Sequence, residues 1–257
     1  PREVLDGERE AHNRSVPHVS FYCPNYDILM NNKNSDEYNN VQYFFKLLAM
    51  CHDTIPEHSD NMIKLSASNP DDEALVAASS YFGYKFTDRE DDTIILESRD
   101  NGILKIQLLE TIKFTSKRKR MSVVIKENNN IRLLIKGADT SIVSRVKRGQ
   151  DQLVKTTISH MEQYSREGLR CLLVGYRDLS IEEWNTWEQK YHAASTDLEQ
   201  LDLLKKGLSN KIEALEEEIE KDIILIGSTA IEDKLQDGVP ECIAQLVDAG
   251  INLWVLT

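Results

Sequence analysis

The chain has 257 residues and a formal net charge of −12 at pH 7, from 31 Lys and Arg against 43 Asp and Glu. A hydrophobic fraction of 40% and a charged fraction of 29% exclude an intrinsically disordered chain and predict one large domain or two smaller ones. The acidic balance argues against a protein whose main role is to coat nucleic acid or anionic lipid, and no apolar run approaches the roughly 18 residues of a membrane span.

The N-terminal part begins with little hydrophobic periodicity. Because it includes the asparagine-rich stretch NNKNSDEYNN, we expect residues 1–37 to be a lead-in loop that is partly disordered. Apolar residues then recur every three or four positions from Tyr38 to Met50, which predicts a helix. A second helix is expected after Asn69, which can cap it, with Pro70 at its first position and Gly83 after its end.

The middle of the chain changes to short β-rich runs between Thr93 and Ile135, namely IILES, ILKIQLL, MSVVIK and IRLLIK. Consecutive strands with short turns predict an antiparallel sheet. Helical periodicity returns from Leu153 to Gly168 and again after Ser180, where Glu183 is placed for a capping box. One long acidic helix is expected from Asp197 to Asp222, where leucine and isoleucine step by three or four.

The C-terminal part is predicted to be a β-α-β unit: strand IILIG, helix Val239–Ala249 and strand INLWVL. Both strands are apolar on both faces, as in a parallel sheet covered by helices. We therefore predict a boundary near Asp222, with an α+β domain of antiparallel sheet and flanking helices over residues 38–222 and a parallel-sheet fragment over residues 223–257. Both ends look cut, so we expect a piece of a longer protein.

The densest group of functional residue types is FTSKRKRMSV, which begins at Phe114, followed by KGADT, which begins at Lys136. A strand-end aromatic ring with nearby cations suits a nucleotide, because the ring stacks on a base, worth roughly 1–3 kcal/mol, and the ammonium groups neutralise phosphates. Taken alone, the cations from Lys117 to Arg120 are equally compatible with a nuclear-import or nucleic-acid patch or with a solvated turn.

Six motifs in order resemble the cytosolic ATP-binding region of type-IV P-type ATPases, the phospholipid flippases. They are LLAMCH, NPDDEALVAA, FTSKRKRMSV, KGADT, GLRCL and TAIEDKLQDGVPE, and the similarity runs from about residue 41 to residue 257. The resemblance implies a nucleotide-binding domain of antiparallel sheet and helices, inserted into a phosphorylation domain of haloacid-dehalogenase type. It thus implies that residues 223–257 are a partial phosphorylation domain.

The resemblance also implies the ligands and partners. ATP is the expected nucleotide, and Mg²⁺ is expected to be bound mainly by parts of the protein outside this chain. The transported phospholipid would be bound by a membrane domain that this chain lacks. The chain itself would lie at the cytosolic face of the membrane. An accessory subunit of the full-length pump is a further candidate partner, and no nucleic acid is implied.

Individual roles follow from the same motifs. Phe114 resembles the ring that stacks on adenine, and Lys136 resembles the lysine at the deep end of the pocket, with Ser116 and Lys119 beside them. Arg170 occupies the arginine of the GLR motif, whose planar guanidinium suits bidentate contact with phosphate. The alternative for this arginine is a surface ion pair.

Asp72 departs from the family pattern. The family usually has SPDE where this chain has NPDD, so Asp72 replaces a glutamate that accepts a hydrogen bond from the amino group of the base. It is one methylene shorter, so the contact would be longer or would pass through a water. The alternatives are that neighbouring Glu73 takes this role, or that Asp72 serves the helix N-terminus.

Catalysis is not expected from this chain. Thr257 would open the family's TGD motif and is the last candidate site residue, while the DKTGT motif with its phosphorylated aspartate is not in the sequence. The chain is therefore expected to bind ATP without turning it over. Asp233 resembles a residue at the hinge between the two domains, although an exposed loop acid is the simpler interpretation.

Three alternatives remain open. The cation-transporting P-type ATPases share the Phe, KGA and GLR elements, although RKRMSV and AIEDKLQ favour a flippase. A nucleotide sensor and an RNA-binding patch at Lys117–Arg120 are the others. No metal site is assigned, because Cys51, His52 and His58 lack a fourth ligand.

Overall fold

The centre of the molecule is an antiparallel sheet. The computed structural model describes residues 19, 21, 23–59, 62–66, 69–233 and 237–254, and within these residues the sheet has seven strands in the order β3-β4-β5-β6-β7-β8-β9. Its strands are β3 (Tyr84–Glu90), β4 (Thr93–Ser98), β5 (Gly102–Ile112), β6 (Arg120–Glu127), β7 (Asn130–Gly137), β8 (Arg170–Leu179) and β9 (Ile224–Ile231). Each strand pairs antiparallel with its neighbour in sequence. The predicted α+β fold with an antiparallel sheet is therefore confirmed.

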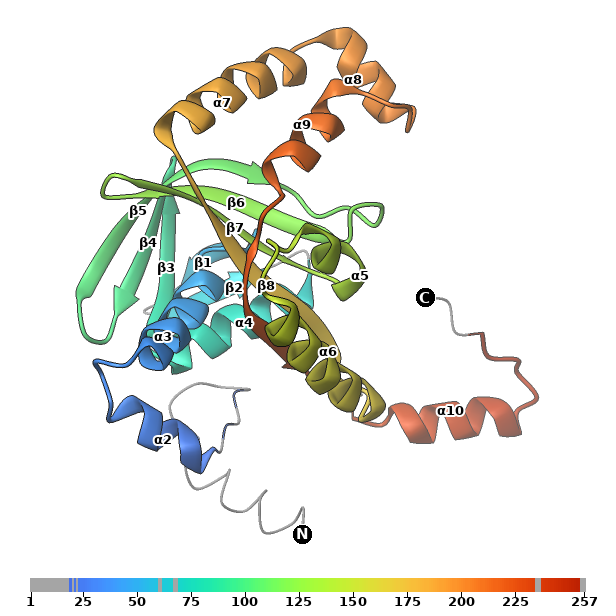
Figure 1. The fold of residues 1–257 in the computed structure, drawn as a ribbon. Helices are drawn as coiled ribbons and strands as arrows, with labels where there is room; N and C mark the ends of the chain where they lie inside the picture. The colour runs from blue at the N-terminus through green and yellow to red at the C-terminus, as the bar shows by residue number, and fades with distance from the viewer. Residues whose placement is uncertain are drawn as a thin grey trace.

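Helices accompany the sheet on both faces (Figure 1). They are α2 (Pro24–Met30), α3 (Asp36–Leu48), α4 (Pro70–Tyr81), α5 (Asp139–Ile142), α6 (Asp151–Arg166), α7 (Ile181–Ser195), α8 (Leu198–Lys205), α9 (Lys211–Ile219) and α10 (Val239–Asp248), with a 3-10 turn at Val143–Arg145 and a two-stranded sheet of β1 (Ile55–Ser59) and β2 (Met62–Ser66). Asn69 and Ser180 cap α4 and α7 as predicted.

Two hydrophobic cores lie on opposite faces of the sheet, because successive side chains of a strand alternate between faces. Val123 of β6 joins a core with α3 and α4, whereas the next residue, Val124, joins a core with α5, α6, α7 and α9. In Figure 1 the helices α7, α8 and α9 are grouped at the top of the molecule. The sheet is therefore covered on both sides.

The predicted C-terminal β-α-β unit differs from what is observed. Its first strand, β9, pairs antiparallel with β8 and so belongs to the main sheet, and residues 251–254 form no strand. Ile223 and Leu225 pack into one core, while Ile226 packs against the other. The apolar residues on both faces of β9 are therefore explained by an antiparallel sheet that has a hydrophobic core on each side. The expected parallel pairing was wrong, and the assignment of residues 223–257 to a partial phosphorylation domain stays a prediction.

Two other regions add detail to the sequence interpretation. The long acidic helix is instead two helices, α8 and α9, because Gly207 has a left-handed φ of +68° and Asn210 caps a new helix. In the lead-in of residues 1–37, most residues up to residue 22 lie outside the described residues. α2 forms in the part that follows, and its Tyr26 contacts Phe82 edge-on at 5.2 Å between ring centroids.

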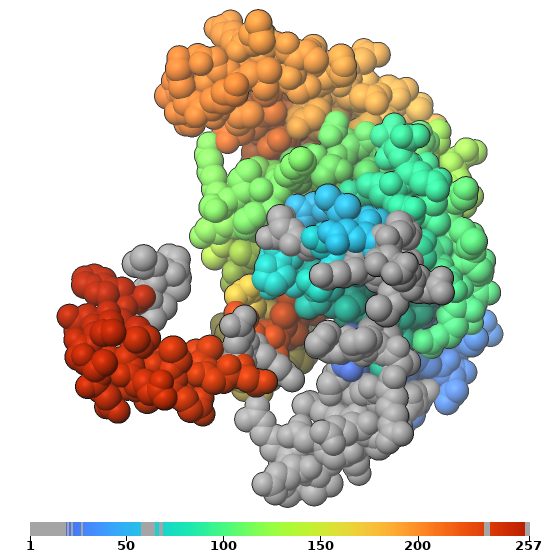
Figure 2. Space-filling view, turned by 180° about the vertical axis from the view of Figure 1, so that it is seen from behind, coloured from blue at the N-terminus to red at the C-terminus, as the bar shows by residue number. Residues whose placement is uncertain are grey.

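The C-terminal helix is set apart from this body. α10 projects away from the sheet (Figure 1; Figure 2), and none of its residues is buried. Across the described part of the chain, no helix has the length and apolar character needed to cross a membrane.

Candidate functional site

A cavity of about 370 Å³ lies where strands of the sheet meet the start of α4. It is lined by residues from six segments: Asp53, Asn69, Asp71, Asp72, Lys113, Phe114, Lys119, Met121, Lys136, Gly137, Ala138, Arg170 and Leu172. Five of the seven predicted site residues are in this set: Asp72, Phe114, Lys119, Lys136 and Arg170. The volume lies within the roughly 300–1,000 Å³ typical of small-molecule sites.

The sheet topology explains why residues far apart in sequence meet there. Because β5 to β8 are antiparallel, the end of β5, the start of β6, the end of β7 and the start of β8 lie at one edge. Gly137 makes this edge compact, since a Cβ there would lie 2.5 Å from the Cβ of Arg120 and 2.7 Å from the carbonyl oxygen of Lys119. The glycine of the KGAD sequence therefore lets two backbones approach closely.

A buried ion pair forms one wall of the cavity. Nζ of Lys136 donates to Oδ1 of Asp72 at 2.6 Å, and each side chain is only 5% exposed. The other carboxylate oxygen accepts a long hydrogen bond, 3.4 Å, from the backbone N–H of Asp53. The carboxylate of Asp72 thus already has two donors, and its contact with a base stays a prediction. The acid fixes the position of Lys136.

Arg170 bridges two acidic residues. Its Nη1 donates to Asp71 at 2.6 Å and its Nη2 donates to Asp233 at 2.7 Å, while its side chain remains 48% exposed. The surface ion pair, one of the two alternatives for this arginine, is therefore observed. It connects the segment after β9 with the first turn of α4, at the border of the cavity.

Phe114 and Lys119 are both accessible to a ligand. Phe114 is 53% exposed, and Lys119 is exposed with no ion-pair partner among the described residues. Apolar side chains of Met121 and Leu172 line the cavity with them. Ser116 is exposed on the adjacent turn but does not line the cavity, and Thr257 lies outside the described residues.

Comparison with known proteins decides the family. A family model described as "P-type ATPase, cytoplasmic domain N" matches residues 40–238. The chain belongs to this family. It is 44% identical over 223 residues to the phospholipid-transporting ATPase DRS2 of Saccharomyces cerevisiae, which covers 84% of this chain and 16% of that protein.

Two further relatives agree with this assignment. The phospholipid-transporting ATPase ID of Homo sapiens is 39% identical over 216 residues, covering 83% of this chain and 17% of that protein. The phospholipid-transporting ATPase DNF1 of Chaetomium thermophilum is 36% identical over 263 residues, covering 99% of this chain and 16% of that protein. The N-domain chain therefore spans about a sixth of the length of these curated relatives.

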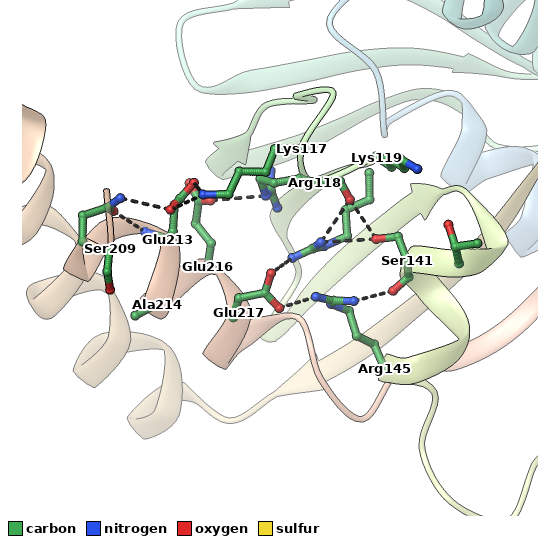
Figure 3. Close-up of a pocket in the computed structure, with 13 residues that line it drawn as sticks. Lys117, Arg118, Lys119, Ser141, Arg145, Ser209, Glu213, Ala214, Glu216 and Glu217 are labelled. Atoms are coloured by element: carbon green, nitrogen blue, oxygen red, sulfur yellow. Dashed lines mark hydrogen bonds and ion pairs between the residues drawn. The ribbon is translucent and has the colours of Figure 1, made fainter. Parts of the chain in front are cut away.

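The cations of this N domain do not all face the nucleotide-sized cavity. A second cavity, of about 540 Å³, lies between the 117–120 turn, α5 and α9 (Figure 3). Here Lys117 pairs with Glu213 at 2.7 Å, Arg118 contacts Glu216 at 3.2 Å and Arg120 contacts Glu217 at 2.5 Å. Three of the four consecutive cations are thus neutralised by one acidic helix, which weakens the RNA-binding alternative.

Cys51 and His52 of the N domain are fully buried and are not among the residues that line the first cavity. Burial raises the pKa of the Cys51 thiol to about 12. Burial, with added repulsion from Lys136 and Arg89, holds the pKa of His52 well below its usual value. The neutral ring of His52 accepts from Thr54 N–H at 3.1 Å and donates to the Ala49 carbonyl at 2.9 Å. Both residues therefore serve the core, and the side chain of His58 lies outside the described residues.

Sequence reasoning missed several residues of the site. Asp53, Lys113 and Leu172 line the cavity without having been assigned a role. Lys113 directly precedes Phe114 and Leu172 belongs to GLRCL, so their motifs were a usable signal. Glu220, which follows α9, gave no such signal, because nothing in the local sequence relates it to Arg118 and Arg120, about a hundred residues earlier in the chain.

Proposed function

We propose that this chain is the ATP-binding domain of a phospholipid-translocating P-type ATPase, which positions ATP for phosphorylation of an aspartate outside the chain. The observation that carries the proposal is the cavity in which Phe114, Lys119 and the buried Lys136 come together. Positioning of the γ-phosphate against its acceptor is a large part of what accelerates a group transfer.

The residues present fit a nucleotide in chemical type. An exposed phenyl ring beside apolar side chains offers a surface for a purine, because base–aromatic stacking is worth roughly 1–3 kcal/mol. Lys113 and Lys119 are exposed lysines without ion-pair partners among the described residues, so they are free to attract phosphates. The guanidinium group of Arg170 can bind phosphate in a bidentate way only if its ion pair with Asp71 or Asp233 is broken.

The Asp72 side chain has a defined part in this proposal. It holds Lys136 at the wall of the cavity, and any contact with the amino group of the base would be additional, since an ionised carboxylate has about four acceptor positions. Mg²⁺ would be bound mainly by other parts of the full-length protein.

The support for lipid transport comes from the relatives, whose names describe phospholipid-transporting ATPases. On that basis the parent protein of this chain would move phospholipids, with this domain at the cytosolic face of a membrane and with an accessory subunit as a candidate partner. The names of these relatives favour this function over the cation-transporting and the nucleotide-sensing alternatives.

The test is a calorimetric titration of the full chain with ATP. Phe114→Ala should weaken binding by about 1–3 kcal/mol, since it removes the stacking surface. Tyr164→Ala is the matched control, because Tyr164 is a 41% exposed aromatic residue on α6 outside the cavity. A folded Phe114→Ala chain with unchanged affinity would refute the site, and a folded wild-type chain that binds no adenine nucleotide at millimolar concentration would refute the function.

A further inference from the structure

Glu220, at the C-terminal end of α9, is a fully buried carboxylate that accepts hydrogen bonds from the 117–120 turn and from β6. Its Oε2 accepts from Nε of Arg120 at 2.7 Å, and its Oε1 accepts from Nη2 of Arg118 and from Oγ of Ser122. One acidic side chain thus binds both residues that flank Lys119. The established family and the proposed function leave this carboxylate without a role.

The backbone of Lys119 is held by two hydrogen bonds. Its N–H donates to the Thr115 carbonyl at 2.8 Å, and its own carbonyl accepts from Ala138 N–H at 2.9 Å. Its φ of +54° lies in the left-handed region, which is unfavourable for a residue with a Cβ and persists only where surrounding contacts fix it. The two arginine contacts to Glu220 supply part of that fixation.

The direction of the Lys119 side chain follows from this arrangement. Arg118 and Arg120 both turn toward α9, and their side chains are 7% and 3% exposed. Figure 3 shows Lys119 reaching away from the glutamates, and the same lysine lines the nucleotide cavity. Pinning both neighbours to one carboxylate leaves the opposite side for Lys119.

We propose that Glu220 is a positioning residue for the nucleotide site: by holding Arg118 and Arg120, it aims the ammonium group of Lys119 at the phosphates of the bound nucleotide. This inference rests on the proposed function. A lysine in this position attracts the phosphates of the ligand and contributes little to binding of the base. Glu220 therefore affects the preference for ATP over adenosine, a property that a merely structural contact would not alter.

The experiment measures dissociation constants of the full chain for ATP and for adenosine, in the wild type, Lys119→Ala, Glu220→Gln and the double variant. Lys119→Ala should weaken ATP binding roughly tenfold, the scale of one hydrogen bond to a charged group, and should leave adenosine binding unchanged. Glu220→Gln keeps the shape but removes the charge, so it should reproduce most of this loss. The double variant should be no worse than Lys119→Ala, because both changes remove the same interaction.

Glu213→Gln is the matched control. Glu213 lies on the same helix and pairs with the same turn through Lys117, yet it does not contact Arg118 or Arg120 among the described residues. Its ratio of ATP to adenosine affinity should equal that of the wild type. If Glu213→Gln lowers the ratio as much as Glu220→Gln does, the effect is general to α9 and the proposal is overturned.

The other outcomes are equally defined. A folded Glu220→Gln chain that keeps the wild-type ratio, while Lys119→Ala loses it, overturns this inference and leaves the proposed function intact. If Glu220→Gln does not fold, Arg120→Lys takes its place, because it keeps the charge but loses the planar fork; an unchanged ratio there also overturns the inference. A wild-type chain that binds neither ligand refutes the function and the inference together.

Discussion

Lys119 lines both cavities beside the 117–120 turn, but the two cavities differ in how their charged side chains are paired. In the cavity against α9, Lys117, Arg118 and Arg120 each contact a glutamate. In the nucleotide cavity, Lys119 has no carboxylate partner among the described residues. Four consecutive cations therefore serve two purposes: three fasten the turn to the fold, and one is left for a ligand.

The largest effect is expected from removing one partner of the buried ion pair Lys136–Asp72 of the nucleotide cavity. Lys136→Met leaves the carboxylate of Asp72 buried without its cation, so the free energy of unfolding should fall by about 3–5 kcal/mol in urea denaturation. The double variant Lys136→Met with Asp72→Leu should recover most of this loss, because it removes the charge together with its partner. If the double variant is as unstable as the single one, packing rather than charge explains the loss.

Gly137 of β7 lies against the 117–120 turn, beside the nucleotide cavity. Gly137→Ala places a Cβ 2.5 Å from that of Arg120, which forces β7 or the turn to move and should cost about 1–3 kcal/mol of unfolding free energy. Gly227→Ala is the control, since a Cβ there meets only Phe44, at 3.6 Å, an ordinary contact distance. Equal stability losses in the two variants would show that close approach at Gly137 has no special importance.

The buried ring of His52 should make the stability of the domain depend on pH. The folded-state pKa of His52 is lowered by burial, so the unfolded state binds a proton that the folded state does not, and stability falls as pH drops through about 6.5. The slope should approach about 1.4 kcal/mol per pH unit for this one group. His52→Asn should flatten the dependence between pH 7 and 5, while His192→Gln, at an exposed histidine, should leave it unchanged.

The fourth and smallest effect is expected at the outer edge of the α9 cavity. The Lys117 side chain is 65% exposed, so its pair with Glu213 is largely screened by water. Lys117→Ala should therefore change the free energy of unfolding by about 0–1 kcal/mol in urea denaturation. A loss of several kcal/mol would mean that the exposed and buried pairs of this turn act as one unit.

Sequence patterns predicted the elements whose signals are local. The strands β4 to β7 follow from their β-branched runs and short turns, and α4 follows from Asn69 and Pro70 at its start. β8 was not predicted, because Arg170, Gly175 and Arg177 interrupt its apolar pattern. Its strand form depends on pairing with β7 on one side and β9 on the other.

The candidate site divides in the same way. Phe114, Lys136 and Arg170 were named from their motifs, and the structure brings them to one cavity although their roles stay predictions. That Asp72 would bind Lys136, and that Arg170 would bridge two acids, could not be read from the motifs. Ion-pair partners depend on which charges the fold brings within a few ångströms, since a charge attracts any opposite charge that lies near it.

From local sequence patterns and motifs one could predict the fold class, the strands with strong β propensity and five of the residues that line the nucleotide cavity. Only the tertiary structure shows that β9 is the last strand of the antiparallel sheet and that the acidic segment forms two helices, α8 and α9. It also shows that Glu220 accepts hydrogen bonds from both neighbours of Lys119. The difference follows from how far along the chain each kind of interaction reaches. Propensities and caps act within a few residues, whereas strand edges, burial and charge pairing are satisfied only by segments that meet in space.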